Sequence, residues 1–309
     1  HRDLHSFPTR RSSDLGYAPS GASNGQYEAL EIRDEDMTRY EGKGVQKAIA
    51  NINTTLKDAV INMDSADQKG IDQKMIELDG TNNKSRLGSN ATLALSMAIA
   101  KAEAKTQKIE LFQYLARLSG KNDDKYTMPI PFMNILNGGK HAVGSTDFQE
   151  FMIVPIRFDS FSRALQAGVE IYHSLGKILN DRSYQPLVGD EGGFAPALFS
   201  NEQAMELLTM SIREAGYSAG EDVFIALDPA ASRFYSENIY QLHRENRSLT
   251  SEEMIDFYET WIEKFPIISI EDALSENDWE GWENLTRRMG DRVELIGDDL
   301  YATNKDLLK

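Results

Sequence analysis

Three short apolar segments, each ending in acidic residues, constrain the fold of this chain more than any other feature of its sequence. They are DVFIALD (222–228), PIISIED (266–272) and VELIGDD (293–299). A helical pattern lies between the first and the second, and another lies between the second and the third. Alternation of strand and helix is typical of parallel strands joined by crossover helices. We therefore expect an α/β domain in this part of the chain.

The two intervening helices can be placed from their apolar faces and their ends. The first begins near Thr250 with Glu253 three residues later, which is the pattern of a capping box. Pro266 ends it. Its apolar face comprises Met254, Phe257, Tyr258, Trp261 and Phe265, and that of the second helix comprises Trp279, Trp282, Leu285 and Met289. The acids are 43 (271 − 228) and 27 (298 − 271) residues apart, so the first crossover has room for an insertion.

The acids at the ends of these segments predict a metal site. In a (β/α) barrel the carboxyl ends of the strands share one face, so Asp228, Glu271 and Asp298 are expected to converge there. Three carboxylates in a small dry space need a cation, because like charges raise one another's pKa. Oxygen ligands without His or Cys favour Mg²⁺. The alternative is that each acid caps the helix that follows it.

The stretch PLVGDEGGFAP (186–196) places Asp190 and Glu191 directly before two glycines, where neither helix nor regular strand is expected. Such a segment is either a solvated turn or a loop that carries a carboxylate to a ligand. The converging acids favour the second interpretation, with Glu191 above the same face as a general acid or base.

Two further loops carry polar residues that are candidates for this site. LNGGKHAVGSTDFQEF (136–151) contains His141, Gln149 and Glu150, although a single His in a glycine-rich loop is more often a surface residue. PSGASNG (19–25) has small residues whose amides can bind an anion and a hydroxyl, that of Ser23, which can bind a metal. A plain linker explains the second loop equally well.

Two domains are expected from the length of 309 residues and from a change in pattern near residue 125. Residues 1–15 are polar, lack the apolar core of a signal peptide and are set aside as an unrelated or artefactual tail. Residues 16–125 are rich in helical pattern, with helices expected over 45–60 and 87–105, the latter capped by Ser89 or Asn90. Residues 126–309 begin with short buried strands and continue with helices over 161–180 and 201–216.

Composition excludes several classes of function. The net charge of −16 argues against a nucleic-acid partner, which requires a basic surface. The same charge fits cation binding, but solvated acidic helices produce it equally well. Without cysteine the chain has neither disulfides nor thiolate ligands. No apolar run approaches the roughly 18 residues of a membrane span.

The motifs together resemble the enolase family, in the order in which that family has them. They are PSGASNGQYEALEIRD, LDGTNNKSRLGSNATLALSMAIAKA, PFMNILNGGKHA, QEFMIVP, GDEGGFAP, IALDPAAS, SIED and GDDLYATN. The resemblance covers nearly all of the chain after the first 15 residues. It implies an α+β N-terminal domain over 16–125, whose first strand is missing, and a partial enolase-type (β/α)8 barrel over 126–309.

The resemblance also implies an activity: phosphopyruvate hydratase, the reversible dehydration of 2-phosphoglycerate to phosphoenolpyruvate in glycolysis, with two Mg²⁺ ions at the site. Asp228, Glu271 and Asp298 match the ligands of the tighter ion, and Ser23 matches a ligand of the second. Glu191 matches the acid that helps hydroxide to leave, with Glu150 beside it. His141 and Gln149 match substrate-contacting positions. A cytoplasmic homodimer or larger homo-oligomer is implied, with cell-surface or secreted pools also known in the family.

Two features of the family pattern do not occur in these 309 residues. The family's lysine base lies on a strand beyond the GDD strand, and its phosphate-binding HRSGE-type segment lies further on. About five of eight barrel strands are expected here. We therefore expect the chain as written to show no hydratase activity, and to act at most as a metal-binding or interaction-competent piece.

Overall fold

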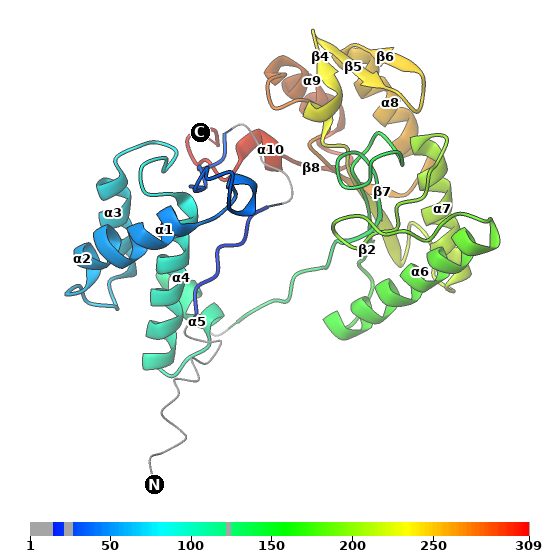
Figure 1. The fold of residues 1–309 in the computed structure, drawn as a ribbon. Helices are drawn as coiled ribbons and strands as arrows, with labels where there is room; N and C mark the ends of the chain where they lie inside the picture. Colours follow the sequence, from blue (N-terminus) through cyan, green and yellow to red (C-terminus); the bar gives the residue numbers. More distant parts are fainter. Residues whose placement is uncertain (1–14, 22–26, 122–124, 309) are drawn as a thin grey trace. The chain divides into compact units, whose positions relative to one another are not determined.

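A computed structural model describes residues 15–21, 27–121 and 125–308 of the chain (Figure 1). Residues 28–126 belong to one compact unit and residues 127–309 to a second. Each unit is described by itself.

The described part of the first unit consists of helices joined by extended segments. Its elements are η2 (Tyr40–Gly42), α1 (Gln46–Asn51), η3 (Ile52–Leu56), α2 (Lys57–Val60), α3 (Gln68–Asp79), α4 (Ser89–Thr106) and α5 (Leu111–Leu118). Its core is formed by Ala48, Leu56, Ile71, Met75, Leu87 and Ala91. No regular strand is present among the described residues of this unit, so its β component is limited to extended backbone such as residues 28–34.

Two local predictions for this unit need correction. The helix expected over 45–60 is interrupted by a π-helical turn, η3. The N-cap of α4 is Gly88, at φ 96°, rather than Ser89 or Asn90. The Asn90 side chain instead binds an extended segment: its Oδ1 accepts from the Ile32 amide at 3.2 Å and its Nδ2 donates to the Ile32 carbonyl at 3.1 Å.

A five-stranded sheet organises the second unit, in the order β1-β2-β3-β7-β8. The strands are β1 (Met133–Asn137), β2 (Glu150–Pro155), β3 (Val223–Asp228), β7 (Ile267–Glu271) and β8 (Glu294–Ile296). The pairs β1–β2 and β2–β3 are antiparallel, whereas β3–β7 and β7–β8 are parallel. The expected parallel alternation is therefore correct for the three acid-ended segments.

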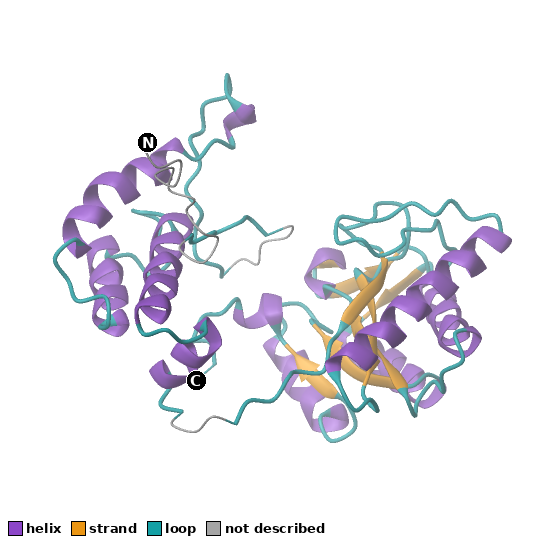
Figure 2. Cartoon of the chain, turned by 90° about the horizontal axis from the view of Figure 1, so that it is seen from below, coloured by secondary structure: helices purple, strands orange, loops and turns teal. Residues whose placement is uncertain are grey.

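Helices cover one face of this sheet. They are α6 (Phe161–Asp181), α7 (Asn201–Glu214), α8 (Ser251–Lys264) and α9 (Trp279–Met289), and Figure 2 shows them along the outside of the strands. The expected capping box of α8 is present, with both Thr250 and Glu253 hydrogen-bonded across the first turn. Phe148 is fully buried in this core and contacts the rings of Phe257 and Trp261.

Alternate strand residues point to the other face, which we call the acid face. There Met152, Val154 and Ala226 form a smaller apolar cluster. Because side chains alternate along a strand, Glu150 lies on the same face as Met152, and it pairs with Asp228 of β3. The register thus brings two acids side by side at one end of the sheet.

The insertion expected between the first two acid-ended segments is a small antiparallel sheet. It consists of β4 (Tyr235–Ser236), β5 (Ile239–Leu242) and β6 (Arg247–Leu249), preceded by η4 (Ala231–Phe234). The third acid-ended segment differs from expectation: its strand ends at Ile296, and Asp298 begins the short helix α10 (Asp298–Tyr301).

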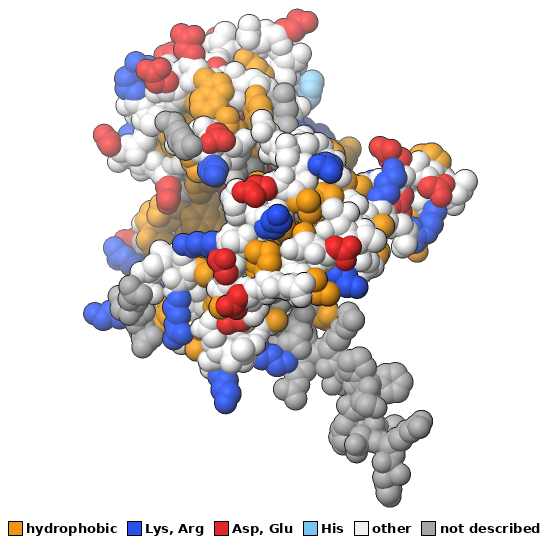
Figure 3. Space-filling view, turned by 90° about the vertical axis from the view of Figure 1, so that its left-hand side faces the viewer, with side chains coloured by type: hydrophobic (Ala, Val, Ile, Leu, Met, Phe, Trp, Pro, Cys, Tyr) orange, Lys and Arg blue, Asp and Glu red, His pale blue; other side chains and the backbone are white. Residues whose placement is uncertain are grey.

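Charged side chains of both signs are interspersed on the face drawn in Figure 3. Among the described helices, none combines the length and the apolar character needed to cross a bilayer.

Candidate active site

The carboxyl ends of β3, β7 and β8 lie together because these strands are parallel neighbours. Glu271 is the last residue of β7 and pairs with Ile296, two residues before Asp298. Oxygen atoms of Glu271, Asp272 and Asp298 lie within 4.8 Å of one another. Two of the three predicted ligands therefore belong to one group of acids, and the group includes a neighbour that was not predicted.

Asp272 has a backbone role as well as a place in this group. At φ 41°, its backbone turns out of the strand. Its Oδ2 accepts from the Asp299 amide at 2.8 Å and its Oδ1 from the Leu300 amide at 3.4 Å. Asp272, which was not among the predicted acids, thus caps the start of α10 and holds it next to Glu271. The sequence signal was the acid directly after Glu271 in SIED.

Asp228 lies on the adjacent strand and is only 6% exposed. Its Oδ1 accepts from the Ala230 amide at 2.8 Å. Within the described part of the chain it is not in the group formed by Glu271, Asp272 and Asp298. Asp228 nevertheless interacts electrostatically with this end of the sheet. Burial is the largest cause that raises its pKa, and the charges of Glu150, Glu271 and Asp272 raise it further.

A second group consists of His141, Glu150 and Glu191. His141 Nε2 lies 3.9 Å from Glu150 Oε1 and 3.8 Å from Glu191 Oε1. Only Glu150 stands on a strand, whereas the other two come from separate loops. The structure therefore brings together three of the residues that the sequence singled out as lining the mouth of the site.

The loop that carries Glu191 runs along the outer edge of β1. Phe194 forms a parallel bridge with Leu136, and its amide donates to the Ile135 carbonyl at 2.9 Å. A Cβ at Gly193 would stand 2.4 Å from Asn137 Oδ1 and 3.0 Å from the Leu136 amide. Gly193, the third glycine of GDEGGFAP, is therefore required by this close approach to β1.

Asn134 of β1 was not predicted as part of the site. Its Nδ2 donates to Glu191 Oε2 at 2.9 Å. It pairs with Met152, so it lies on the acid face. The sequence offers one signal for Asn134: side chains alternate between the two faces of a strand, and Asn134 occupies one of the positions of β1 that share the acid face.

The family models agree with this geometry. Residues 125–309 match the enolase C-terminal TIM barrel domain, and residues 9–115 match the enolase N-terminal domain. This chain belongs to the enolase family. The second match begins inside the segment 1–15 that was set aside as an unrelated tail.

Enolases use Mg²⁺, and the acid groups of this chain fit such an ion. Burial, and then the charges of Asp298 and Asp299, raise the pKa of Glu271 to about 7. Burial is also the main reason that the pKa of Asp272 rises to about 7. Carboxylates with this much mutual repulsion are stabilised by a divalent cation, and their oxygens are the ligands that Mg²⁺ prefers.

The His141 group has a different electrostatic balance. Burial, and then Glu191 as hydrogen-bond partner and as a charge, raise the pKa of Glu150 to about 8. The carboxyl group of Glu150 therefore holds a proton near neutral pH. Gln149 is 4% exposed, and its backbone amide donates to the Asp228 carbonyl at 3.0 Å.

Several buried polar atoms near these groups have no hydrogen-bond partner among the described residues. They are Gln149 Oε1, His141 Nδ1, and both amide atoms of Asn137. Buried polar atoms in native proteins are normally bonded, so these positions suit water or a polar ligand. Ser23, the predicted ligand of the second ion, lies outside the described residues.

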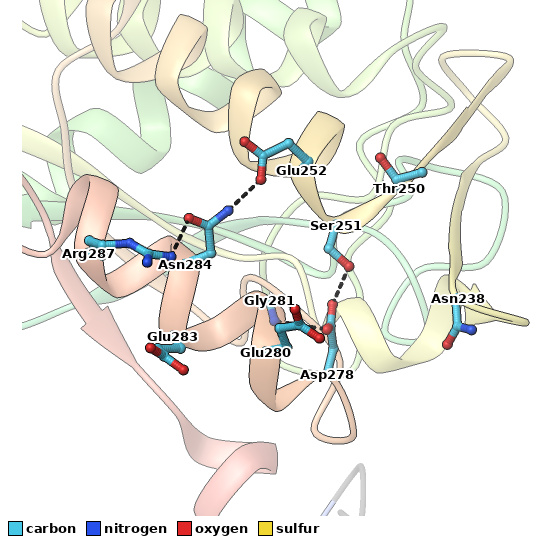
Figure 4. A pocket seen from close by; sticks show the side chains of 10 residues that line it. All are labelled: Asn238, Thr250, Ser251, Glu252, Asp278, Glu280, Gly281, Glu283, Asn284 and Arg287. Atoms are coloured by element: carbon cyan, nitrogen blue, oxygen red, sulfur yellow. Dashed lines mark hydrogen bonds between the residues drawn. The ribbon is translucent and has the colours of Figure 1, made fainter.

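A separate pocket of about 590 Å³ lies where α8 and α9 begin (Figure 4). Its polar groups largely bind one another. Asp278 accepts from Ser251 Oγ at 2.6 Å and from the Gly281 amide at 3.0 Å, and Asn284 donates to Glu252. These contacts cap and join two helices, and we assign no chemistry to this pocket.

Proposed function

We propose that this site serves phosphopyruvate hydratase chemistry, the reversible Mg²⁺-dependent dehydration of 2-phosphoglycerate to phosphoenolpyruvate. The observation that carries the proposal is the pair of neighbouring groups at one end of the sheet in an enolase-family chain. One group is made of acids alone, and the other combines a histidine with two carboxyl groups, one of which is protonated near neutral pH.

Asp228, Glu271 and Asp298 are the residues that would hold the tighter ion, and Ser23 would bind the second. Bound Mg²⁺ would offset the negative charge that develops on the substrate carboxylate when the neighbouring proton is removed. Asp272 keeps Asp298 in place by capping α10. The strands supply the rigidity that a metal site requires.

Glu191 and Glu150 would assist departure of the hydroxide. A carboxyl group that keeps its proton near neutral pH can donate it to the leaving oxygen, which then departs as water. Asn134 holds Glu191, and burial together with the neighbouring Glu191 raises the pKa of Glu150. His141 and Gln149 would contact the substrate.

A second proposal concerns these 309 residues on their own. In this alternative the chain binds Mg²⁺ through its acid groups without turning over substrate. A cytoplasmic homodimer or larger homo-oligomer remains part of the first proposal only.

One assay separates the two proposals. Phosphoenolpyruvate formation from 2-phosphoglycerate is followed by its ultraviolet absorbance, with Mg²⁺ and then with excess chelator. For this chain alone we expect Mg²⁺ binding by calorimetry and no turnover. Turnover that the chelator abolishes would establish the hydratase activity for the chain itself. Absence of both binding and turnover in a folded protein would remove both proposals.

A further inference from the structure

The buried residue Asn201 makes four hydrogen bonds beside the loop that carries His141 and Gln149, three through its side-chain amide and one through its backbone amide. Asn201 is the first residue of α7 and has no exposed surface. Its Oδ1 accepts from the amides of Asp147 at 2.8 Å and Phe148 at 3.2 Å, and its Nδ2 donates to Asp147 Oδ2 at 3.0 Å. Its own backbone amide donates to Glu245 Oε1 at 2.8 Å.

The turn between β5 and β6 reaches the same place from another direction. The Arg244 amide donates to Asp147 Oδ2 at 2.9 Å, and the Arg244 side chain donates to the Gly144 carbonyl. We call Asp147, Asn201, Arg244 and Glu245 the clamp, and residues 138–149 the site loop. The clamp joins the site loop to α7 and to the small inserted sheet.

The remaining contacts of the site loop hold its middle, where the Asp190 amide donates to the His141 carbonyl at 3.3 Å and Ser145 Oγ donates to the Pro196 carbonyl at 2.6 Å, as well as its two ends. The Gly138 amide donates to the Gln149 carbonyl at 2.8 Å, and the Gly139 amide donates to the Thr146 carbonyl at 2.9 Å. Phe148 is fixed in the core by its ring. Between these ends lie His141 and Gly144, the latter at φ 90°. The direction of the chain leading into Phe148 is set by the clamp, because Asn201 binds two successive amides.

We propose that Asn201 and Asp147 are positioning residues, which act through the site loop to hold His141 and Gln149 where a substrate would meet them. The expected effect on substrate binding rests on the proposed function, whereas the expected effect on the position of the site loop does not. A buried amide whose oxygen and nitrogen are both hydrogen-bonded favours one arrangement, because a displaced loop would leave these groups unpaired. Neither residue touches the acid groups, so metal binding and loop position can be altered separately.

The direct test is Asn201→Asp. This change keeps the acceptor for the two loop amides but places a carboxylate against the Asp147 carboxylate. The double variant Asn201→Asp with Asp147→Asn removes the repulsion and supplies a new donor between the two side chains. The amide nitrogen that replaces Asp147 Oδ2 then faces the Arg244 amide, so the double variant restores the clamp only in part. Asn284→Asp is the matched control: Asn284 also donates to a carboxylate, that of Glu252, and the charge change is the same, but it lies on α9.

Amide hydrogen exchange of the site loop is the first measurement. In Asn201→Asp we expect exchange over residues 142–148 to rise about tenfold, with β3 amides unchanged because the opening is local. The double variant should recover part of this rise and exchange about threefold more slowly than Asn201→Asp, and Asn284→Asp should match the parent. Unchanged exchange in a folded Asn201→Asp variant, or no recovery in the double variant, would overturn the clamp.

Binding of 2-phosphoglycerate with saturating Mg²⁺ is the second measurement. Asn201→Asp should weaken it about tenfold while Mg²⁺ affinity changes less than about twofold, and the double variant should recover part of the lost affinity. Weakened Mg²⁺ binding, or intact substrate binding with a loosened loop, would overturn the link between the clamp and the site. If the parent chain binds no 2-phosphoglycerate, the proposed function fails. The hydrogen-exchange measurement then still tests whether the clamp holds the site loop.

Arg244→Ala is the variant for the hydrogen-exchange test if Asn201→Asp does not fold. It removes the bond to the Gly144 carbonyl and leaves the Arg244 backbone amide on Asp147. We expect exchange to rise about threefold over residues 142–145 alone. No rise there would contradict the proposed contribution of the inserted sheet.

Discussion

The two groups of acids are held in place by different parts of the fold. Glu271 ends a strand. Asp298 lies two residues beyond Ile296, the last residue of the next strand. His141 and Glu191 lie on loops, and their positions depend on side-chain contacts such as that between Asn134 and Glu191. Strand pairing therefore fixes Asp228 and Glu271, with Asp298 held beside them by the Asp272 cap, whereas loops and their contacts fix His141 and Glu191. Changes to the two kinds of support should therefore have separable effects.

The largest effect is expected from removing a strand-end ligand. Glu271→Gln deletes one negative charge from the group and should lower Mg²⁺ affinity about 100-fold or more, measured by calorimetry. The variant should be at least as stable as the parent chain without metal, because repulsion among buried acids is reduced. Equal Mg²⁺ affinity in the two proteins would show that Glu271 is not a ligand.

Metal-free protein should lose stability as the pH rises. The pKa of Glu271 is raised to about 7 and that of Glu150 to about 8, both above the ordinary value of 4.5. A raised carboxyl pKa contributes stability below the ordinary value and loses it as the pH rises through the folded-state value. We expect the melting temperature in chelator to fall between about pH 4.5 and 8, and added Mg²⁺ to reverse the fall. A flat profile in chelator would contradict the assigned burial of these acids.

The loop beside β1 should respond to a single methyl group. Gly193→Ala places Cβ 2.4 Å from Asn137 Oδ1, so either the loop or β1 has to move. We expect a loss of about 1–3 kcal/mol in the free energy of unfolding, measured in urea. Mg²⁺ affinity should remain within about twofold, since the strand-end ligands are unaffected. A stability equal to that of the parent would show that the approach to β1 is looser.

A smaller effect is expected from the contact that holds Glu191. Asn134→Ala removes the donor at 2.9 Å from Glu191 Oε2 and should cost about 1 kcal/mol in stability. Binding of 2-phosphoglycerate with Mg²⁺ should weaken severalfold, and Mg²⁺ binding itself should not change. If both ligands bind as in the parent, Asn134 has no positioning role.

The sequence predicts the strand-supported part of this site better than the loop-supported part. Asp228 and Glu271 could be placed because each ends an apolar run of strand-like residues and parallel strands share an end. Glu191, Glu150 and His141 were chosen from their loops and from the family resemblance, but their mutual distances depend on bridges such as Leu136–Phe194, which no periodicity reveals. The cap formed by Asp272 and the contact of Asn90 with Ile32 were missed because the backbone groups that these side chains bind are distant in the sequence.

The same limit explains the corrected boundary at the third acid-ended segment. GDD was expected to finish a strand, but Asp272 binds the Asp299 amide and thereby begins α10 at Asp298. Local sequence contains the acids and the glycine. The partner that selects helix over strand is 27 residues (299 − 272) earlier in the chain.

The most direct test of the account is a side-by-side Mg²⁺ titration of Asp298→Asn and Asp272→Asn by calorimetry. The account predicts that Asp298→Asn loses about 100-fold in affinity with little change in stability, because it removes a ligand. It predicts that Asp272→Asn, which weakens a helix cap, loses about 1 kcal/mol in stability and keeps Mg²⁺ affinity within about tenfold. Unchanged Mg²⁺ binding in a folded Asp298→Asn variant would contradict the assignment of a metal centre to these strand ends.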